Sequence, residues 1–306
     1  MVNVVIRDRI AALLWLGPVG LVLLAAGLLI AVILRDLPAV SDFIRTYPGQ
    51  YDLPAWAPVG FPAWLAWQHF FSAFLLLLLV RTGWEIRTGG RPSAFWTRTA
   101  LAERTLPPVR MPLRTWLHLA LDVLWIANGV LYVVLLFVTG QWVRIVPTSW
   151  EVIPHAVSAG IQYASLDWPT ENGWVNYNSL QQLSYFATVF IASPLAIITG
   201  FRMSSLWNQR WRRFDRVFPM RLAKAVHLPV MLYFVAFTIV HVTLVLATGA
   251  LRNLNHMYAV RDEASWVGAI IFAGSLLVML AGWLFVRPSK MKRIAALGGT
   301  VKEMGR

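Results

Sequence analysis

Six apolar stretches, each long enough to cross a lipid bilayer, constrain this chain more than any other feature of its sequence. They cover residues 11–34, 62–84, 114–139, 184–203, 223–249 and 265–287. A helix rises about 1.5 Å per residue, so the hydrocarbon core of a bilayer takes roughly 20 residues. Only 13% of the 306 residues are charged, which is about half the usual fraction of a soluble domain. The sequence therefore predicts an all-α polytopic membrane protein with six transmembrane helices in a single integral membrane domain, residues 1–306.

Several kinds of metal site and enzyme active site are excluded by residue types and motifs that the sequence lacks. The chain has no cysteine, which excludes Cys-ligated zinc, iron–sulfur clusters held by this chain and a thiol nucleophile. It has no glycine-rich nucleotide-binding motif, no nucleophile elbow and no zinc-protease motif. We therefore expect substrate chemistry to lie mostly on another polypeptide.

The basic residues predict how the chain is oriented. The net charge is +13, and 22 of the 27 Lys and Arg residues lie in the N-terminal segment, in segments 81–114 and 202–224, and in the tail from Arg287. The positive-inside rule places both termini and these connections in the cytoplasm. The first stretch is too long for a signal-peptide core and reads as a retained anchor. We interpret the basic residues as determinants of membrane orientation and as contacts to anionic lipid, and not as a nucleic-acid binding surface.

Four histidines fall inside the apolar stretches: His69, His118, His227 and His241. Fourteen residues separate the last two, which puts them within about 40° of one helix face and about 21 Å apart along the axis. The predicted orientation gives His118 and His227 the same depth near the inner surface. It gives His69 and His241 the same depth near the outer surface. The sequence thus predicts two pairs of imidazoles at matching depths.

Paired imidazoles at equal depth are typical of b-type haem, whose iron takes one imidazole on each face. Ligation by two histidines leaves no open iron position and favours electron transfer. A single membrane histidine can also serve as an interhelical hydrogen-bonding group or a proton relay. The matching depths favour two haems. His155 and His256, in the outer connections, are predicted to be surface residues.

The pattern of one histidine on each of two early helices and two on a later helix resembles the di-haem cytochrome b subunits. These are the prokaryotic cytochrome b561-like subunits of formate dehydrogenase, nickel–iron hydrogenase and thiosulfate reductase. The resemblance covers 62–249, a four-helix haem-binding core. It includes Tyr177 to Tyr185 (YNSLQQLSY), Pro194, Thr199 and Gly200, Val226 to Pro229 (VHLP), and Val240 to Val242 (VHV). The first stretch is an addition that reverses the orientation of this core, and the last is a further addition or a variant terminal helix.

The resemblance implies that His69 and His241 bind one haem iron and His118 and His227 the other. It also implies electron exchange between a peripheral oxidoreductase subunit and membrane quinone, either menaquinone or ubiquinone. The partner would be a molybdenum or nickel–iron enzyme, or its iron–sulfur subunit, in a respiratory chain of a prokaryotic cell membrane.

Several further residues are candidates for roles around these cofactors. Asp122 lies one turn from His118 and could carry protons for quinone chemistry. On the same face, Gly129 could let a macrocycle approach the backbone. Asn128 is expected to form an interhelical hydrogen bond. The candidates for haem propionates are Arg114, Arg221, Lys224 and Arg202 at the inner surface and Arg144 and Arg252 at the outer surface.

Three other functions remain open on the sequence alone. The first is a proton-coupled transporter that uses the intramembrane His and Asp residues as relay groups. Clear inverted repeats, which many transporters have, are not visible. The second is a haem-containing ferric or sulfoxide-type reductase, for which two histidines on each of two helices are expected. The third is a structural anchor, which leaves the histidine depths unexplained.

Overall fold

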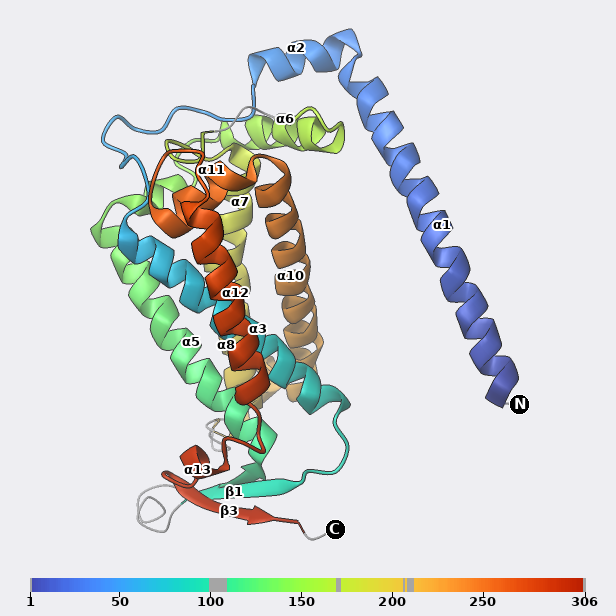
Figure 1. Ribbon diagram of the computed structural model, residues 1–306, viewed down its shortest axis with the longest axis vertical. Helices are drawn as coiled ribbons and strands as arrows, with labels where there is room; N and C mark the ends of the chain where they lie inside the picture. Colours follow the sequence, from blue (N-terminus) through green and yellow to red (C-terminus); the bar gives the residue numbers. More distant parts are fainter. Residues whose placement is uncertain (1, 99–108, 169–171, 206, 208–211, 305–306) are drawn as a thin grey trace. The chain divides into compact units, whose positions relative to one another are not determined.

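The computed structural model describes residues 2–98, 109–168, 172–205, 207 and 212–304 (Figure 1). Six helices in this part of the chain are long and apolar enough to cross a membrane. Their bounds are α1 (Val2–Arg35), α3 (Ala63–Thr88), α5 (Leu113–Val138), the continuous helix Ser179–Met203, α10 (Met220–Ala247) and α12 (Val267–Phe285). The prediction of an all-α polytopic membrane protein is confirmed. Five spans lie within five residues of their predicted bounds, whereas α1 begins at Val2, well before the predicted start at residue 11.

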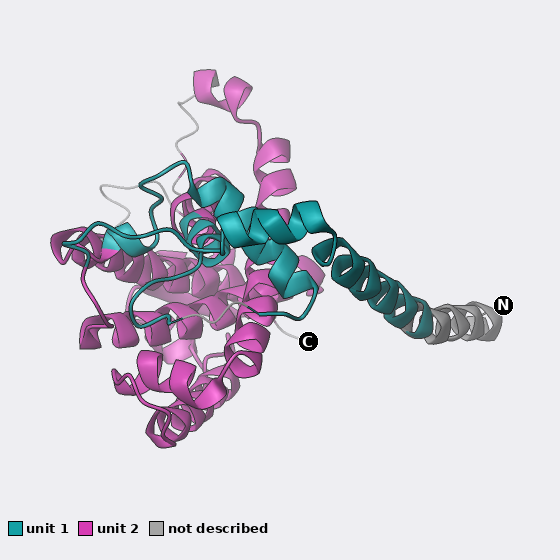
Figure 2. Ribbon diagram, turned by 90° about the horizontal axis from the view of Figure 1, so that it is seen from above, with its two compact units in different colours: residues 1–57, 142–186 teal, residues 58–141, 187–306 magenta. Residues whose placement is uncertain are grey.

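The chain divides into two compact units (Figure 2). Unit 1 contains residues 1–57 and 142–186, and unit 2 contains residues 58–141 and 187–306. The boundary passes through the fourth span, in which α7 (Ser179–Phe186) belongs to unit 1. The π-helical segment η2 (Ala187–Ala192) and α8 (Ser193–Met203) belong to unit 2. All four intramembrane histidines therefore lie in unit 2.

In unit 1, α1 is followed by α2 (Pro38–Thr46), η1 (Gln141–Arg144, shared with unit 2), α6 (Val152–Ala164) and α7. Buried polar side chains connect its segments. The hydroxyl of Tyr51 donates to Oε1 of Gln182 at 2.9 Å, and Gln182 donates to the carbonyl of Val143 at 3.2 Å. Hydrogen-bonded buried polar groups give specific rather than fluid packing. The long connection after the third span is thus a folded structure and not an extended loop.

His155, on α6, is buried at 7% exposure, so the prediction that it is a surface residue is wrong. Its Nδ1 accepts a hydrogen bond from the backbone N–H of Gly49 at 3.2 Å, and its ring meets Tyr47 edge-on. Gly49 has φ +111°, a conformation that L-residues with a side chain rarely adopt. The turn at this glycine brings a backbone donor onto the imidazole, which satisfies the buried ring.

Unit 2 is a bundle of α3, α5, α8, α10 and α12. The contact between α3 and α5 is a leucine cluster that includes Leu75, Leu78 and Leu121. A second cluster joins η2 to α10 through Ala192, Val230 and Phe234. The guanidinium of Arg81 on α3 donates to the carbonyls of Trp283 and Val286, so the end of α12 is tied to α3.

A small antiparallel sheet lies at one end of the unit 2 bundle. It consists of β1 (Ala94–Arg98), β2 (Arg110–Pro112) and β3 (Gly299–Glu303), in the order β2-β1-β3. Phe95 pairs with Pro112 on one side and with Lys302 on the other. The buried indole of Trp96 donates to the carbonyl of Ala295 in α13 (Lys292–Ala295) at 2.9 Å. The short helix α9 (Arg212–Val217) precedes α10. We call this end the sheet end.

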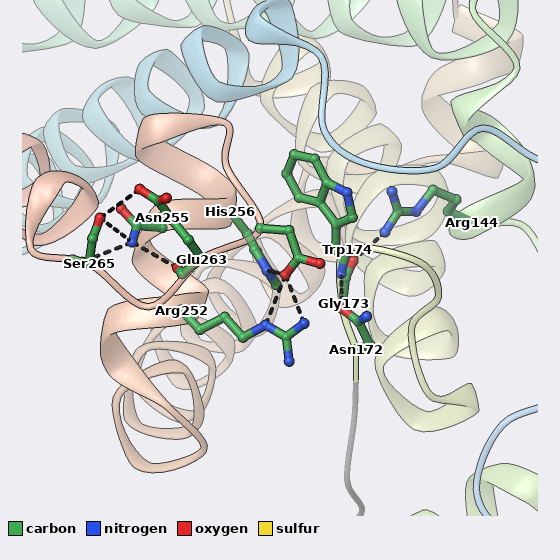
Figure 3. A network of polar contacts seen from close by, with 10 residues as sticks. Arg144, Asn172, Gly173, Trp174, Arg252, Asn255, His256, Glu263 and Ser265 are labelled. Atoms are coloured by element: carbon green, nitrogen blue, oxygen red, sulfur yellow. Dashed lines mark hydrogen bonds and ion pairs between the residues drawn. The ribbon is translucent and has the colours of Figure 1, made fainter.

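The other end of unit 2 holds α11 (Ala250–Leu254) and the π-helical segment η3 (Asn255–Ala259), and is called the η3 end. His256 is only 3% exposed, so the prediction of a surface residue is wrong here too. Its Nε2 lies 2.8 Å from Oδ1 of Asp262, which also accepts from Arg252 (Figure 3). The imidazole of His256, in this π-helical segment, contacts the ring of Phe61 edge-on.

Candidate metal centre

At the η3 end, the structure brings together two histidines from distant parts of the sequence. The rings of His69 on α3 and His241 on α10 have centroids 6.2 Å apart and planes at 56°. A metal–imidazole bond is about 2.0 Å long. Two imidazoles on opposite sides of one metal therefore have ring centroids about 6 Å apart, given that bond length. The separation of the far pair, His69 and His241, fits one metal between them.

Aromatic side chains contact both rings of the far pair. Phe237 stacks on His241 with planes at 5° and centroids 5.6 Å apart. Tyr258 of η3 meets His69 edge-on at 6.1 Å. The buried Nδ1 of His69 has no hydrogen-bond partner among the described residues. A buried polar atom without a partner costs free energy, and Nδ1 of His69 therefore makes no structural hydrogen bond within the described part of the chain that would offset its burial. This fits a ring that holds a prosthetic group.

At the sheet end, His118 on α5 and His227 on α10 are the second pair that the sequence predicts, which we call the sheet-end pair. Nδ1 of His118 lies 2.7 Å from Oγ1 of Thr82 on α3, and Nδ1 of His227 lies 2.8 Å from Oγ1 of Thr199 on α8. Each ring is thus held through Nδ1 by a neighbouring helix, which leaves Nε2 as the nitrogen for a ligand.

A glycine follows each of these threonines and faces the same ring. A Cβ placed on Gly83 would lie 3.4 Å from Cε1 of His118, and one on Gly200 would lie 3.6 Å from Cε1 of His227. A methyl group would just touch the imidazole, and a longer side chain would press against it. The sequence also contains the pairs Thr82-Gly83 and Thr199-Gly200 at matching places in two spans. Sequence reasoning missed Thr82 and Gly83, which this repeated dipeptide could have revealed.

An aromatic layer separates the two histidine levels on α10. Tyr233 stacks on Phe237 at 6.1 Å, and Phe234 meets Trp125 of α5 edge-on at 6.1 Å. Tyr233 also shares a hydrogen bond of 2.8 Å with Thr188 in the π-helical segment η2. The interior between the two pairs is therefore closely packed and mostly apolar.

Asp122 lies where its spacing from His118 predicts. Its Oδ2 is 4.0 Å from Nε2 of His118, on the next turn of α5. The carboxyl group is thus close to the ring nitrogen that Thr82 leaves uncommitted. One turn and a half further on, Asn128 donates to Ser72 of α3 at 3.0 Å, and the predicted interhelical hydrogen bond is confirmed.

The predicted partners of haem propionates are placed as follows. Arg114 donates to the carbonyl of Gly90 at 2.8 Å, in the connection after α3, whereas Arg221 and Lys224 are exposed on the first turns of α10. Arg202 is held by the carbonyl of Phe218 and by Asp215. Gly129 has open space where a Cβ would stand. Arg114 and Arg202 therefore have structural contacts of their own.

The two outer arginines are also engaged (Figure 3). In unit 1, Arg144 is 1% exposed, donates to the carbonyl of Gly173, and lies with its guanidinium carbon 4.7 Å from the ring centre of Tyr177. In unit 2, Arg252 pairs with Asp262 at 2.8 Å. Both guanidinium groups therefore stabilise the connections in which they lie.

The donor set limits the kind of metal group that fits. No cluster of three or more His, Asp or Glu side chains able to hold a bare ion occurs in the part of the chain that the structure describes. Two facing imidazoles alone suit a metal that brings its own equatorial ligands, as a porphyrin does. Comparison with protein-family models, with curated proteins and with solved structures finds no match to this chain.

Proposed function

We propose that this chain is a membrane cytochrome b subunit that carries two bis-histidine b haems. The observation that carries the proposal is the geometry of the far pair. His69 and His241 lie on two helices of one bundle, and their ring centroids are as far apart as those of two imidazoles that bind one metal from opposite sides. The sheet-end pair, His118 and His227, lies on α5 and α10 nearer the other end, and each ring is held through Nδ1 by a threonine. In this it is similar to the di-haem cytochrome b subunits of formate dehydrogenase, nickel–iron hydrogenase and thiosulfate reductase.

The roles of the chain's own residues follow from their contacts. His69 and His241 would hold the iron of one haem, and His118 and His227 the iron of the other. Bound in this way, a b haem supplies a one-electron carrier with no open iron position. Phe237 and Tyr258 restrict the far-pair rings, whereas Thr82 and Thr199 hold the sheet-end rings. The histidines on α10 are fourteen residues apart, which is about 21 Å along the helix. The two sites therefore lie at different depths.

The direction across the membrane comes from the charges. The connections at the sheet end and the tail after α12 contain 20 of the 27 basic residues, in segments 81–114, 202–224 and 287–306. By the positive-inside rule, we place the sheet end and both termini in the cytoplasm of a prokaryotic cell. The sheet-end pair is then the inner one and the far pair the outer one.

We propose that electrons pass between a peripheral oxidoreductase subunit and the quinone pool through this chain. Asp122 is the only acidic residue of α5, and its Oδ2 lies 4.0 Å from Nε2 of His118, which supports a quinone site near the sheet-end pair. Quinone reduction consumes protons together with electrons, and a carboxyl group beside the site can supply them. The partner subunit would carry the molybdenum, nickel–iron or iron–sulfur chemistry, for which this cysteine-free chain has no ligands.

The test is a haem count on the purified protein. A pyridine-haemochrome spectrum should give two b haems per folded chain, and His69→Ala and His118→Ala should each lose one. His256→Gln is the matched control, because it changes a buried histidine outside both pairs and keeps a donor for Asp262. This control should retain both haems. A folded, monodisperse protein that binds no haem when produced with excess haem would refute the proposal. Proton-coupled transport through the same His and Asp residues would then be the function to test.

A further inference from the structure

The two threonines that hold the sheet-end pair have the same surroundings. Thr82 and Thr199 are each 1% exposed, and each lies within 2.8 Å of Nδ1 of a histidine on the neighbouring helix. One contact joins α3 to α5 and the other joins α8 to α10. Two independent helix pairs have therefore arrived at the same hydrogen bond.

The direction of each hydrogen bond can be derived from the threonine's other contact. The hydroxyl of Thr82 donates to the carbonyl of Leu78 at 2.9 Å, and that of Thr199 donates to the carbonyl of Leu195 at 2.6 Å. A hydroxyl group has a single proton, and a carbonyl oxygen can only accept. Because the proton points to the carbonyl, Oγ1 accepts a hydrogen bond from the histidine. Both imidazoles therefore carry their proton on Nδ1.

This proton position decides which nitrogen can bind a metal. A neutral imidazole has one N–H, so a proton on Nδ1 leaves the lone pair on Nε2. An acceptor at Nδ1–H also increases the basicity of Nε2 and fixes the rotation of the ring. Gly83 and Gly200 have no side chain, so Cε1 of each ring can lie close to the helix that holds it.

We propose that Thr82 and Thr199 are matched positioning residues, which fix the tautomer and increase the basicity of Nε2 in the two histidines that would hold the sheet-end haem. This inference rests on the proposed haem binding. The far pair differs, because Nδ1 of His69 has no hydrogen-bond partner among the described residues. The two haem sites of one chain are thus built differently, and each serves as an internal reference for the other.

The experiment compares Thr82→Val, Thr199→Val and the double variant with the natural protein. Valine keeps the shape of threonine and removes the hydroxyl acceptor. His227 also has a hydrogen bond with the backbone of Ala196, so Thr82→Val is expected to have the larger effect of the two. We expect the midpoint potential of one haem to rise, since a less basic imidazole stabilises ferric iron less, while the other potential stays unchanged. Second-shell changes of this kind typically cost about 10–100-fold in affinity, so the same haem should be lost first on dilution. The His69→Ala background, which leaves only the sheet-end haem, identifies the affected signal in redox titration and in electron paramagnetic resonance.

Two controls separate the acceptor from general effects on the helices. Thr238→Val removes a hydroxyl on α10 that donates to the carbonyl of Phe234, and it should leave both potentials unchanged. Thr82→Ser and Thr199→Ser keep the hydroxyl and lose the methyl group, and they should retain the natural potential. A shift in the serine variants equal to that in the valine variants would overturn the inference, because packing and not the hydrogen bond would then be responsible.

The outcomes distinguish this inference from the proposed function. Two haems with unchanged potentials, affinities and resonance signals in the double valine variant would overturn the positioning role and leave haem binding intact. A natural protein without haem would refute the proposed function itself, before any threonine variant is measured. If a valine variant fails to fold, the serine variant at the same site and the valine variant on the other helix decide the question.

Discussion

The ring centroids of His69 and His241 lie 6.2 Å apart, although His69 is in the second apolar span and His241 is in the fifth. The two residues are far apart in the sequence, and only the arrangement of α3 and α10 within one bundle brings their rings together. This proximity predicts that His69 and His241 bind the same metal, and double variants can test that pairing.

Histidines that share one metal should not behave additively. His69→Ala with His241→Ala should lose the same single haem as either change alone, because one missing ligand already empties the site. His69→Ala with His118→Ala should lose both haems, since it removes one ligand from each pair. The haem content per chain, measured by pyridine haemochrome, checks both. Loss of two haems from the first double variant would contradict the pairing.

Asp122→Asn should slow electron exchange with quinone while leaving both haems bound. The carboxamide keeps the size of the side chain but cannot transfer a proton, and such groups typically contribute about 10²–10⁴-fold to proton-coupled steps. The rate of haem reduction by a quinol analogue is the measurement, with dithionite reduction as the control that bypasses quinone. An unchanged quinol rate would remove Asp122 from the proton route.

The hydrogen bond between Asn128 and Ser72 should make a small contribution to stability. It joins α5 to α3 at 3.0 Å inside the bundle, and interhelical hydrogen bonds in membranes average about 0.6 kcal/mol. We expect Asn128→Leu to lower the free energy of unfolding by roughly this amount, measured in detergent or bicelles. Ser72→Ala should have a similar effect, and the two changes together should cost no more than one of them. Additive losses would show that the residues act separately.

Asp262 predicts a dependence of stability on pH at the η3 end. Hydrogen bonds from His256 and Arg252 hold the pKa of this carboxyl below its ordinary value. A carboxyl whose pKa is lowered by folding stabilises the protein above its unfolded pKa, and this contribution is lost as the pH falls through the folded pKa. The group is partly exposed, so the effect should be at most about 1 kcal/mol.

The corresponding measurement is the midpoint temperature of thermal unfolding at several pH values between about 6 and about 3, a range that includes the ordinary carboxyl pKa of about 4. The natural protein should lose more stability across it than Asp262→Asn, which has no charge to lose. Equal losses in the two proteins would show that the hydrogen bonds at Asp262 do not stabilise the fold.

The sequence alone determined the membrane class and the six spans, and it predicts the depths of the four intramembrane histidines. It could do so because span length and the placement of charge are properties of local sequence, set by the thickness of the bilayer and the cost of moving charge across it. The helical period similarly placed His227 and His241 on one face of α10, and Asp122 one turn from His118. The hydrogen bond of Asn128 was predictable because an amide in hydrocarbon must find a partner.

Only the tertiary structure decided which groups surround these histidines. Thr82 reaches His118, and Thr199 reaches His227, through the packing of neighbouring helices. The sheet joins two strands that flank residues 99–109 with a third near the C-terminus, and the strands are too short for an alternating pattern of apolar residues to be recognised in the sequence. His155 and His256 are buried because a glycine turn and a π-helical segment bring partners onto them. These contacts depend on backbone geometry and on residues distant in the chain, and no local pattern encodes either.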